Sequence, residues 1–105
     1  MESFSLFAGL NVIDNSSWIA APVAATILAD LGANVIKIEK PGDGDAYRTL
    51  SSSPVSPDAA ANYMWQMDNR NKRSITLNLK QADGIDILHR LVKQCDIYIT
   101  NQMEF

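Results

Sequence analysis

The chain has 105 residues, of which 47% are apolar and 20% are charged, and its formal net charge is -3. This composition fits one globular domain and excludes a disordered tail, a collagen-like repeat and a disulfide-stabilised secreted module. The acidic balance argues against nucleic acid as a partner, because phosphate neutralisation needs clustered basic residues. No apolar run approaches the roughly 20 residues that span a bilayer, so no membrane partner is expected. Cys95 is the only cysteine and cannot form a disulfide within the chain, which favours a cytoplasmic protein.

The first half of the chain alternates strand and helix patterns. Residues 10–14 form an apolar run with β-branched side chains, which predicts a strand, and residues 34–39 predict a second one. Between them, the Ala-rich segment 20–31 predicts a helix with Pro22 in its first turn and Gly32 after its last. Such a βαβ unit has parallel strands and a right-handed crossover. The side chains expected on the buried face of the helix are Val23, Ile27, Leu28 and Leu31.

The second half continues this alternation after a long segment. Residues 40–57 are rich in Pro, Gly and Ser, which predicts a loop that is functional or mobile. Ser56 is expected to cap a helix that begins at Pro57. A strand, an amphipathic helix and a last strand are predicted at residues 74–79, 85–95 and 96–100.

These elements predict an α/β fold with a Rossmann-like, mostly parallel sheet of about four strands, flanked by helices. Residues 101–105 follow the last strand directly, so no helix is left to cover the second face of the sheet. Because a parallel sheet needs both faces covered, we expect residues 1–105 to be the front part of a larger fold.

The predicted strands also locate a candidate binding site. Ligands of open parallel sheets bind beyond the carboxyl ends of the strands. The first of the segments that follow strands also leads into a helix, whose free N–H groups favour an anionic group. We expect all of these segments to meet at one rim of the sheet. They are residues 15–21, 40–45, 79–80 and 101–103.

The sequence predicts neither a dinucleotide site nor a metal site. The Gly-x-Gly-x-x-Gly motif is absent, since no glycine lies between Asp14 and Gly32, and NAD and FAD are therefore not expected. Glu39 does lie where the ribose-binding acid of an NAD site would be. No metal is expected, because His89 and Cys95 have no partners at the spacing of metal ligands.

The other side chains that could bind a ligand or take part in catalysis are interpreted individually. The basic cluster at residues 69–73 precedes its strand, which predicts a structural or interface role on the opposite rim. Lys80, at the other end of the same strand, is the better phosphate ligand. Trp18 follows the first strand and suits either stacking on a ring or capping the core. No nucleophile with a partner base is found, so no catalytic residue is assigned.

Three stretches carry a family pattern in one order and spacing. The first comprises residues 9–14, 20–22, 28–41, Gly44-Asp45 and Arg48, the second residues 69–80 and the third residues 96–101. Together they resemble the start of the class III CoA-transferases. This family includes formyl-CoA transferase, carnitine CoA-transferase and α-methylacyl-CoA racemase.

The resemblance implies that residues 1–105 are the N-terminal part of a CoA-binding large domain in a longer, interlocked homodimer. Family members move CoA between carboxylic acids through a mixed anhydride and thioesters on one aspartate, or epimerise an acyl-CoA. That aspartate lies downstream of the matched stretches, which implies that this chain alone is inactive. Two alternatives stay open: an acyl-CoA racemase or isomerase of the same fold, and a non-catalytic CoA-binding or dimerisation module.

The resemblance also implies, by position, which residues contact CoA. Two departures from the family pattern, Ala21 in place of a glycine and the bulky Trp18, predict a reshaped acyl end of the pocket. The implied CoA contacts are Ile19, Ala20, Lys40, Leu77, Asn78, Leu79, Lys80, Asn101, Gln102 and Met103.

Overall fold

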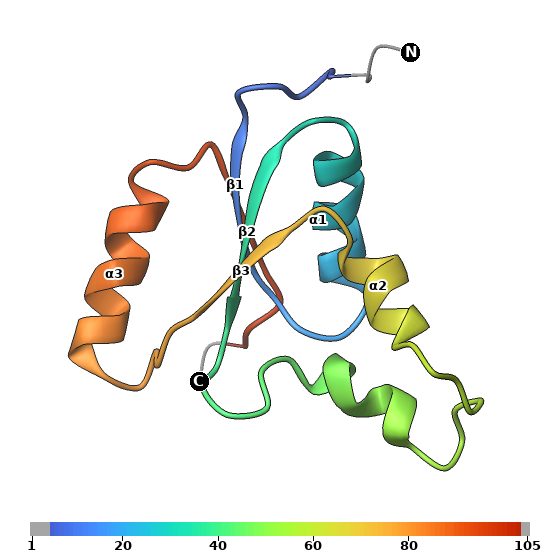
Figure 1. The fold of residues 1–105 in the computed structure, drawn as a ribbon. Helices are drawn as coiled ribbons and strands as arrows, with labels where there is room; N and C mark the ends of the chain where they lie inside the picture. The colour runs from blue at the N-terminus through green and yellow to red at the C-terminus, as the bar shows by residue number, and fades with distance from the viewer. Residues whose placement is uncertain (1–4, 104–105) are drawn as a thin grey trace.

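A computed structural model describes residues 5–103 of the chain. Four parallel strands form one sheet in the order β3-β2-β1-β4 (Figure 1), which confirms the predicted α/β fold. Glu104 and Phe105, which end the expected tail, lie outside the described residues. The elements in chain order are β1 (Asn11–Asn15), α1 (Ala20–Asp30), β2 (Asn34–Glu39), the 3₁₀ helix η1 (Ala46–Ser52), α2 (Tyr63–Asn69), β3 (Arg73–Thr76), α3 (Ala82–Val92) and β4 (Ile97–Thr100).

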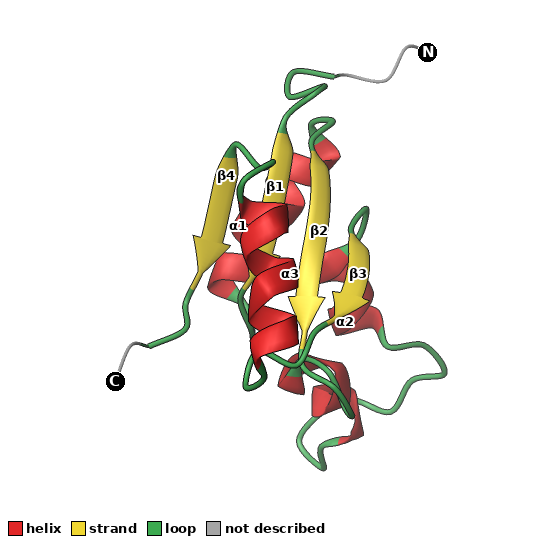
Figure 2. Cartoon of the chain, turned by 90° about the vertical axis from the view of Figure 1, so that its left-hand side faces the viewer, coloured by secondary structure: helices red, strands yellow, loops and turns green. Residues whose placement is uncertain are grey.

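Helices cover both faces of the sheet. α1 and α2 lie on one side and α3 lies on the other (Figure 1, Figure 2). Successive residues of β1 face opposite sides, so Val12 packs in the cluster under α1 and Ile13 packs with Leu88 of α3. The prediction that the second face is left uncovered is therefore wrong, because the helix predicted within residues 85–95 packs on the face opposite α1.

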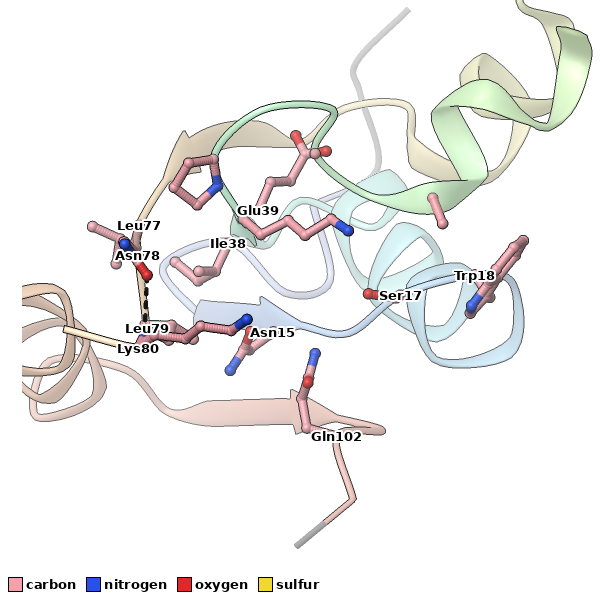
Figure 3. Close-up of a pocket in the computed structure, with 14 residues that line it drawn as sticks. Asn15, Ser17, Trp18, Ile38, Glu39, Leu77, Asn78, Leu79, Lys80 and Gln102 are labelled. Atoms are coloured by element: carbon pink, nitrogen blue, oxygen red, sulfur yellow. Dashed lines mark hydrogen bonds between the residues drawn. The ribbon is translucent and has the colours of Figure 1, made fainter. Parts of the chain in front are cut away.

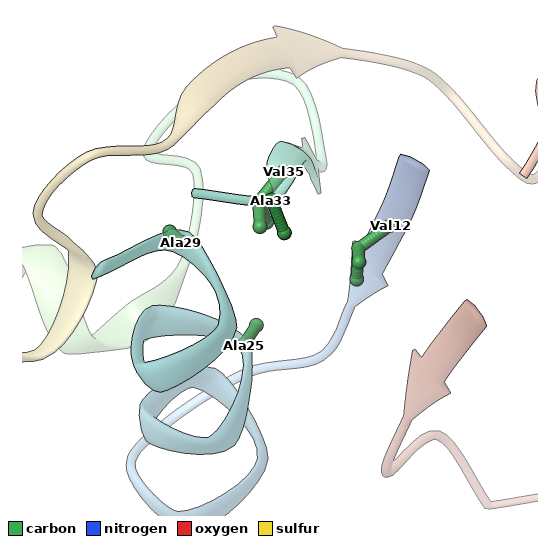
Figure 4. Close-up of a cluster of buried hydrophobic side chains, with 5 residues drawn as sticks. All are labelled: Val12, Ala25, Ala29, Ala33 and Val35. Atoms are coloured by element: carbon green, nitrogen blue, oxygen red, sulfur yellow. The ribbon is translucent and has the colours of Figure 1, made fainter. Parts of the chain in front are cut away.

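α1 buries small side chains against the sheet. Alanine allows the helix axis to approach the strands closely, and dense packing then needs no large side chain from the helix. The predicted buried face is wrong at Ile27, which is 53% exposed. The prediction used hydrophobicity alone, whereas close packing against the sheet places the alanine face of α1 in the interior. The buried residues of α1 are Pro22, Ala25, Thr26 and Ala29. The cluster in Figure 4 comprises Val12, Ala25, Ala29, Ala33 and Val35.

The long segment after β2 is partly ordered by η1. The side chain of Asp45 caps this short helix, accepting a hydrogen bond from the Tyr47 backbone N–H at 3.0 Å. Residues 40–57 therefore include a helix within the predicted loop. Tyr47 is buried, and its hydroxyl donates to Asp68 Oδ2 of α2 at 2.5 Å, which ties the two short helices together.

α2 begins later than the sequence predicts. Its first residue is Tyr63, and the side chain of Asn62 caps it. A helix start at Pro57 with Ser56 as its cap is therefore wrong. The Ser56 hydroxyl instead donates to the carbonyl oxygen of Leu50 at 2.7 Å, which closes a turn after η1.

β3 is shorter than the predicted strand at residues 74–79, because the chain leaves the sheet after Thr76. α3 then packs directly on the departing segment. Gly84 is buried in its first turn, and a Cβ at this position would overlap the carbonyl oxygen of Asn78. Glycine thus lets α3 approach and position residues 77–80. Neither α3 nor any other helix within residues 5–103 is long and apolar enough to cross a bilayer.

Candidate functional site

A pocket of about 650 Å³ lies beyond the carboxyl ends of the strands, a volume in the range of small-molecule sites (Figure 3). Segments that follow all four strands contribute to it. Because the strands are parallel, their carboxyl ends meet at this one rim, as the sequence predicts. The residues that line it are Asn15, Ser17, Trp18, Ile38, Glu39, Lys40, Pro41, Gly44, Ala46, Leu77, Asn78, Leu79, Lys80 and Gln102.

The pocket brings together part of the predicted set. Six of the implied CoA contacts line it: Lys40, Leu77, Asn78, Leu79, Lys80 and Gln102. Four others do not line it: Ile19, Ala20, Asn101 and Met103. Nothing in the structure tests whether any of these residues contacts CoA, so that role stays a prediction for all of them.

The rule that ligands of open parallel sheets bind beyond the carboxyl ends of the strands is here called the sheet rule. Most of the lining residues that are not among the implied CoA contacts fall in segments that this rule selects. Ile38 and Glu39 are different, because they belong to β2 itself. Ala46 begins η1, which the sequence did not predict. The sheet rule finds residues that follow a strand, but it does not find the last strand residues or a helix that folds back over the rim.

A turn of unusual geometry follows β1 at the pocket. Trp18 has a φ of 71°, in the left-handed region that favours glycine. Its backbone N–H donates to Asp45 Oδ1 at 3.2 Å. The preceding residue, Ser17, donates its N–H to Asn101 Oδ1 at 3.0 Å and accepts from Asn101 Nδ2 at 2.7 Å. Segments after β2 and β4 thus hold the turn after β1.

A buried ionic group lies beneath this turn. Lys37 Nζ lies 2.9 Å from Asp45 Oδ2 and 3.7 Å from Asp14 Oδ2, and all three side chains are almost completely buried. The same ammonium group donates to the carbonyl oxygen of Ser16 at 2.9 Å. A buried lysine is tolerated only with such partners. These contacts fix the backbone at the end of β1, from which the turn with Trp18 continues.

The basic cluster at residues 69–73 has a structural role, as predicted. Lys72 Nζ is buried and lies 2.8 Å from Asp14 Oδ2, 2.8 Å from the Pro22 carbonyl oxygen and 2.8 Å from Asn69 Oδ1. Burial lowers the pKa of Lys72, and the neighbouring Asp14 carboxylate opposes that shift. Arg70 Nη2 binds Asp30 Oδ2 of α1 at 2.6 Å. These basic groups join β3 to β1 and α1 rather than lining the pocket.

The Glu39 carboxylate at the pocket wall is already bound within the chain. Arg48 donates to it from Nε and Nη2 at 2.7 Å each, and Asp45 donates its backbone N–H at 2.9 Å. The Ser74 hydroxyl is a further donor. Burial opposes ionisation of Glu39, but these hydrogen bonds outweigh it and lower the pKa to about 2. Arg48 is itself held against the ring of Trp65, 3.8 Å from its centroid.

Two lysine side chains at the pocket supply its positive charge. Lys40 follows β2 and Lys80 follows the end of β3, and both are exposed. Within the described residues, neither ammonium group forms an ion pair. They present two positive charges to one cavity, and this arrangement suits a ligand with phosphate groups.

Two residues considered in the sequence lie away from this pocket. Cys95 is half-buried and packs on the cluster under α3, and His89 is exposed on α3. Among residues 5–103, no group of three or more His, Cys, Asp or Glu side chains is arranged to hold a metal ion.

Comparison with known sequences identifies one family along nearly the whole chain. The model of CoA-transferase family III matches residues 7–104. The (R)-2-hydroxy-4-methylpentanoate CoA-transferase of Clostridioides difficile is 43% identical over 99 residues, covering 91% of this chain and 24% of that protein. The human succinyl-CoA:glutarate CoA-transferase is 36% identical over 101 residues, covering 96% of this chain and 22% of that protein. The chain spans about a quarter of the length of these curated relatives.

Solved structures agree with the sequence comparison. The crystal structure of a CAIB/BAIF family protein from Brucella suis matches with a TM-score of 0.79 and 34% identity, covering 91% of this chain and 25% of that one. A crystal structure of Rv3272 from Mycobacterium tuberculosis matches with a TM-score of 0.78 and 33% identity, covering 92% of this chain and 26% of that one. The three sequence stretches, the parallel sheet and the family match agree, and the chain belongs to CoA-transferase family III.

Proposed function

We propose that the strand-end pocket binds CoA through its adenine, ribose and phosphate groups, in a protein that moves CoA between carboxylic acids. The family and the transferase names of its relatives support this proposal. Those relatives are named for different acids, so the proposal extends to carboxylic acids as a class.

The observation that carries the proposal is a pair of lysines at the pocket that form no ion pair with any residue between 5 and 103. Lys40 and Lys80 come from segments after two different strands, yet both line the same cavity. CoA carries a diphosphate and a separate ribose phosphate, so it offers anionic groups to two separated cations. Charge-assisted contacts of this kind are about twice as strong as neutral hydrogen bonds.

Neutral polar groups complement these charges. Asn15, Asn78 and Gln102 line the pocket with side-chain amides, which both donate and accept hydrogen bonds. Asn78 Oδ1 already accepts the Lys80 backbone N–H at 3.1 Å, which fixes the orientation of its amide. Glu39 is not free to bind a ribose, since its carboxylate is occupied by Arg48. The site therefore fits CoA better than NAD.

We further propose that transfer proceeds through an aspartyl mixed anhydride and thioesters, as the family resemblance implies. None of the residues described here is assigned to that covalent step. The contribution proposed for this chain is to bind and orient CoA, which brings the thioester to the reacting carboxylate at high effective concentration.

Titration calorimetry of the purified protein with CoA and with NAD tests the binding proposal. We expect CoA to bind and NAD to bind much more weakly. Lys80→Ala should weaken CoA binding by about 1–3 kcal/mol, because a phosphate or ribose contact is lost.

Lys93→Ala provides the matched control. Lys93 is also an exposed lysine, but it lies after α3 and outside the lining of the pocket. Its loss should leave CoA affinity within about twofold of the original value. A preference for NAD, or equal effects of the two substitutions, would overturn the proposal.

A further inference from the structure

Trp18 has an unusual backbone conformation. It is a bulky residue in the left-handed region, with a φ of 71°. Its side chain is 51% exposed although it lines the pocket, so burial in the core does not hold it there. Strained backbone of this kind persists only where the surroundings fix it, and it is concentrated at functional sites.

A carboxyl and an amide side chain fix this conformation, and they come from the segments that follow β2 and β4. Asp45 accepts the Trp18 N–H at 3.2 Å, and Asn101 clamps the Ser17 peptide with two hydrogen bonds of 3.0 and 2.7 Å. Asp45 is in turn fixed by Lys37 at 2.9 Å. The backbone at Trp18 is therefore fixed before any ligand binds. This fixes the point from which the indole extends, and such preorganisation lowers the entropy cost of contact.

The two sides of the pocket differ in chemistry. Figure 3 shows Trp18 on the side of α1, across the pocket from Asn78 and Lys80. Hydrogen bonds to adenine and phosphates are available on the Asn78 and Lys80 side. Trp18 and the neighbouring Ile19, which is 50% exposed, present apolar surface instead.

The side of Trp18 also lacks a cation for a second carboxylate within residues 5–103. Lys37 is buried in its pair with Asp45, and Arg48 is bound to Glu39 at 2.7 Å. Under the proposed function, Lys40 and Lys80 bind the phosphates of CoA. An acyl chain that ends in a carboxylate would lose hydration here without gaining a partner.

We propose that Trp18 is a specificity-determining residue, which favours acyl groups with an apolar chain over acyl groups that carry a second carboxylate. This inference rests on the proposed function, since it assumes that CoA occupies the pocket. The indole contacts the acyl chain and removes it from water, and it contributes nothing to recognition of the nucleotide.

Calorimetric titration with CoA, isovaleryl-CoA and succinyl-CoA tests the inference without requiring turnover. The original protein should bind isovaleryl-CoA about tenfold more tightly than succinyl-CoA, as expected for burial of a small branched chain. In Trp18→Asn this preference should fall below about twofold, with CoA affinity unchanged within about twofold. Asparagine tolerates the left-handed backbone, so this substitution removes the indole without adding strain.

Two further variants separate specificity from stability. Trp18→Phe should retain about half of the preference in free-energy terms, because it keeps an apolar ring. Ile27→Asn removes an equally exposed apolar side chain (53%) outside the pocket and should leave all three affinities unchanged.

The possible failures are distinguishable. Absence of CoA binding to the original protein overturns both the proposed function and this inference. CoA binding without a preference for isovaleryl-CoA overturns the inference alone, and so does a preference that survives in Trp18→Asn. Equal weakening of all three ligands in Trp18→Asn also overturns it, because the indole then contacts the nucleotide or only supports the fold.

Discussion

Lys72 Nζ lies 2.8 Å from Asp14 Oδ2, although 58 positions separate the two residues in the sequence, and both side chains are buried. The pair joins the start of β3 to the end of β1, and β2 lies between these strands in the sheet. Asp14 also neighbours Lys37, so one carboxylate serves two buried ammonium groups. The strand ends that form the pocket are therefore held together by buried ion pairs as well as by apolar packing.

Loss of Lys72 should strongly destabilise the protein. In Lys72→Met the apolar stem is largely kept, but Asp14 loses a partner, and breaking a buried pair costs about 3–5 kcal/mol. Unfolding in urea measures this loss. The double variant Asp14→Asn/Lys72→Met should recover part of the stability, since it also removes the Asp14 charge that lost its partner. A single variant within about 1 kcal/mol of the original protein would contradict the structural role.

Glu39 should make the stability depend on pH below about 5. Its pKa is about 2 in the folded chain and 4.5 in the reference state, so its stabilisation is complete above the unfolded value. That stabilisation is lost as the pH falls towards the folded value. The difference in unfolding free energy between the original protein and Glu39→Gln should shrink by about 2 kcal/mol between about pH 6 and pH 3.

Comparison with Glu39→Gln isolates this carboxyl group from the other acidic residues. Urea unfolding at several pH values gives the difference directly. A difference that stays constant with pH would mean that Glu39 is not held ionised by Arg48 and the other donors.

Gly84→Ala should destabilise the protein, in contrast to the usual effect of alanine in a helix. Alanine is favoured over glycine by about 1 kcal/mol in an exposed helix interior. At Gly84, however, the added methyl group would overlap the Asn78 carbonyl oxygen, and overpacking of this kind costs about 1–3 kcal/mol. Thermal unfolding of the variant and the original protein measures whether the substitution lowers or raises the stability. Gly84→Ala should also weaken CoA binding, because the segment 77–80 would shift; a stabilised variant would contradict the close approach of α3.

The sequence predicted the order of the strands and α-helices because they were separated by clear changes of hydrophobic period, but it did not predict η1. For the same reason it placed Cys95 correctly with the apolar side chains under α3, although the helix itself ends at Val92. It failed at Ile27, since periodicity detects apolar residues and does not detect how closely a helix of alanines fits a sheet. It also failed at Ser56, where several residues with capping ability precede α2 and only the fold selects Asn62.

The site was predictable to the extent that the sheet rule applies. Lys40 follows β2 directly and Lys80 follows the strand predicted at residues 74–79, so both were found in this way. The ionic group around Asp14 and Lys37 could not be predicted, because these residues lie within apolar strand patterns and their pairing depends on contacts between distant strands. The left-handed backbone conformation of Trp18 could not be predicted either, since the residue is not a glycine.

A crystal structure of the protein with bound CoA tests the central claim most directly. We predict that the nucleotide of CoA occupies the pocket beyond the carboxyl ends of the four strands, with phosphate oxygens within hydrogen-bonding distance of Lys40 Nζ or Lys80 Nζ. CoA bound elsewhere, with both ammonium groups still exposed to solvent, would contradict the account.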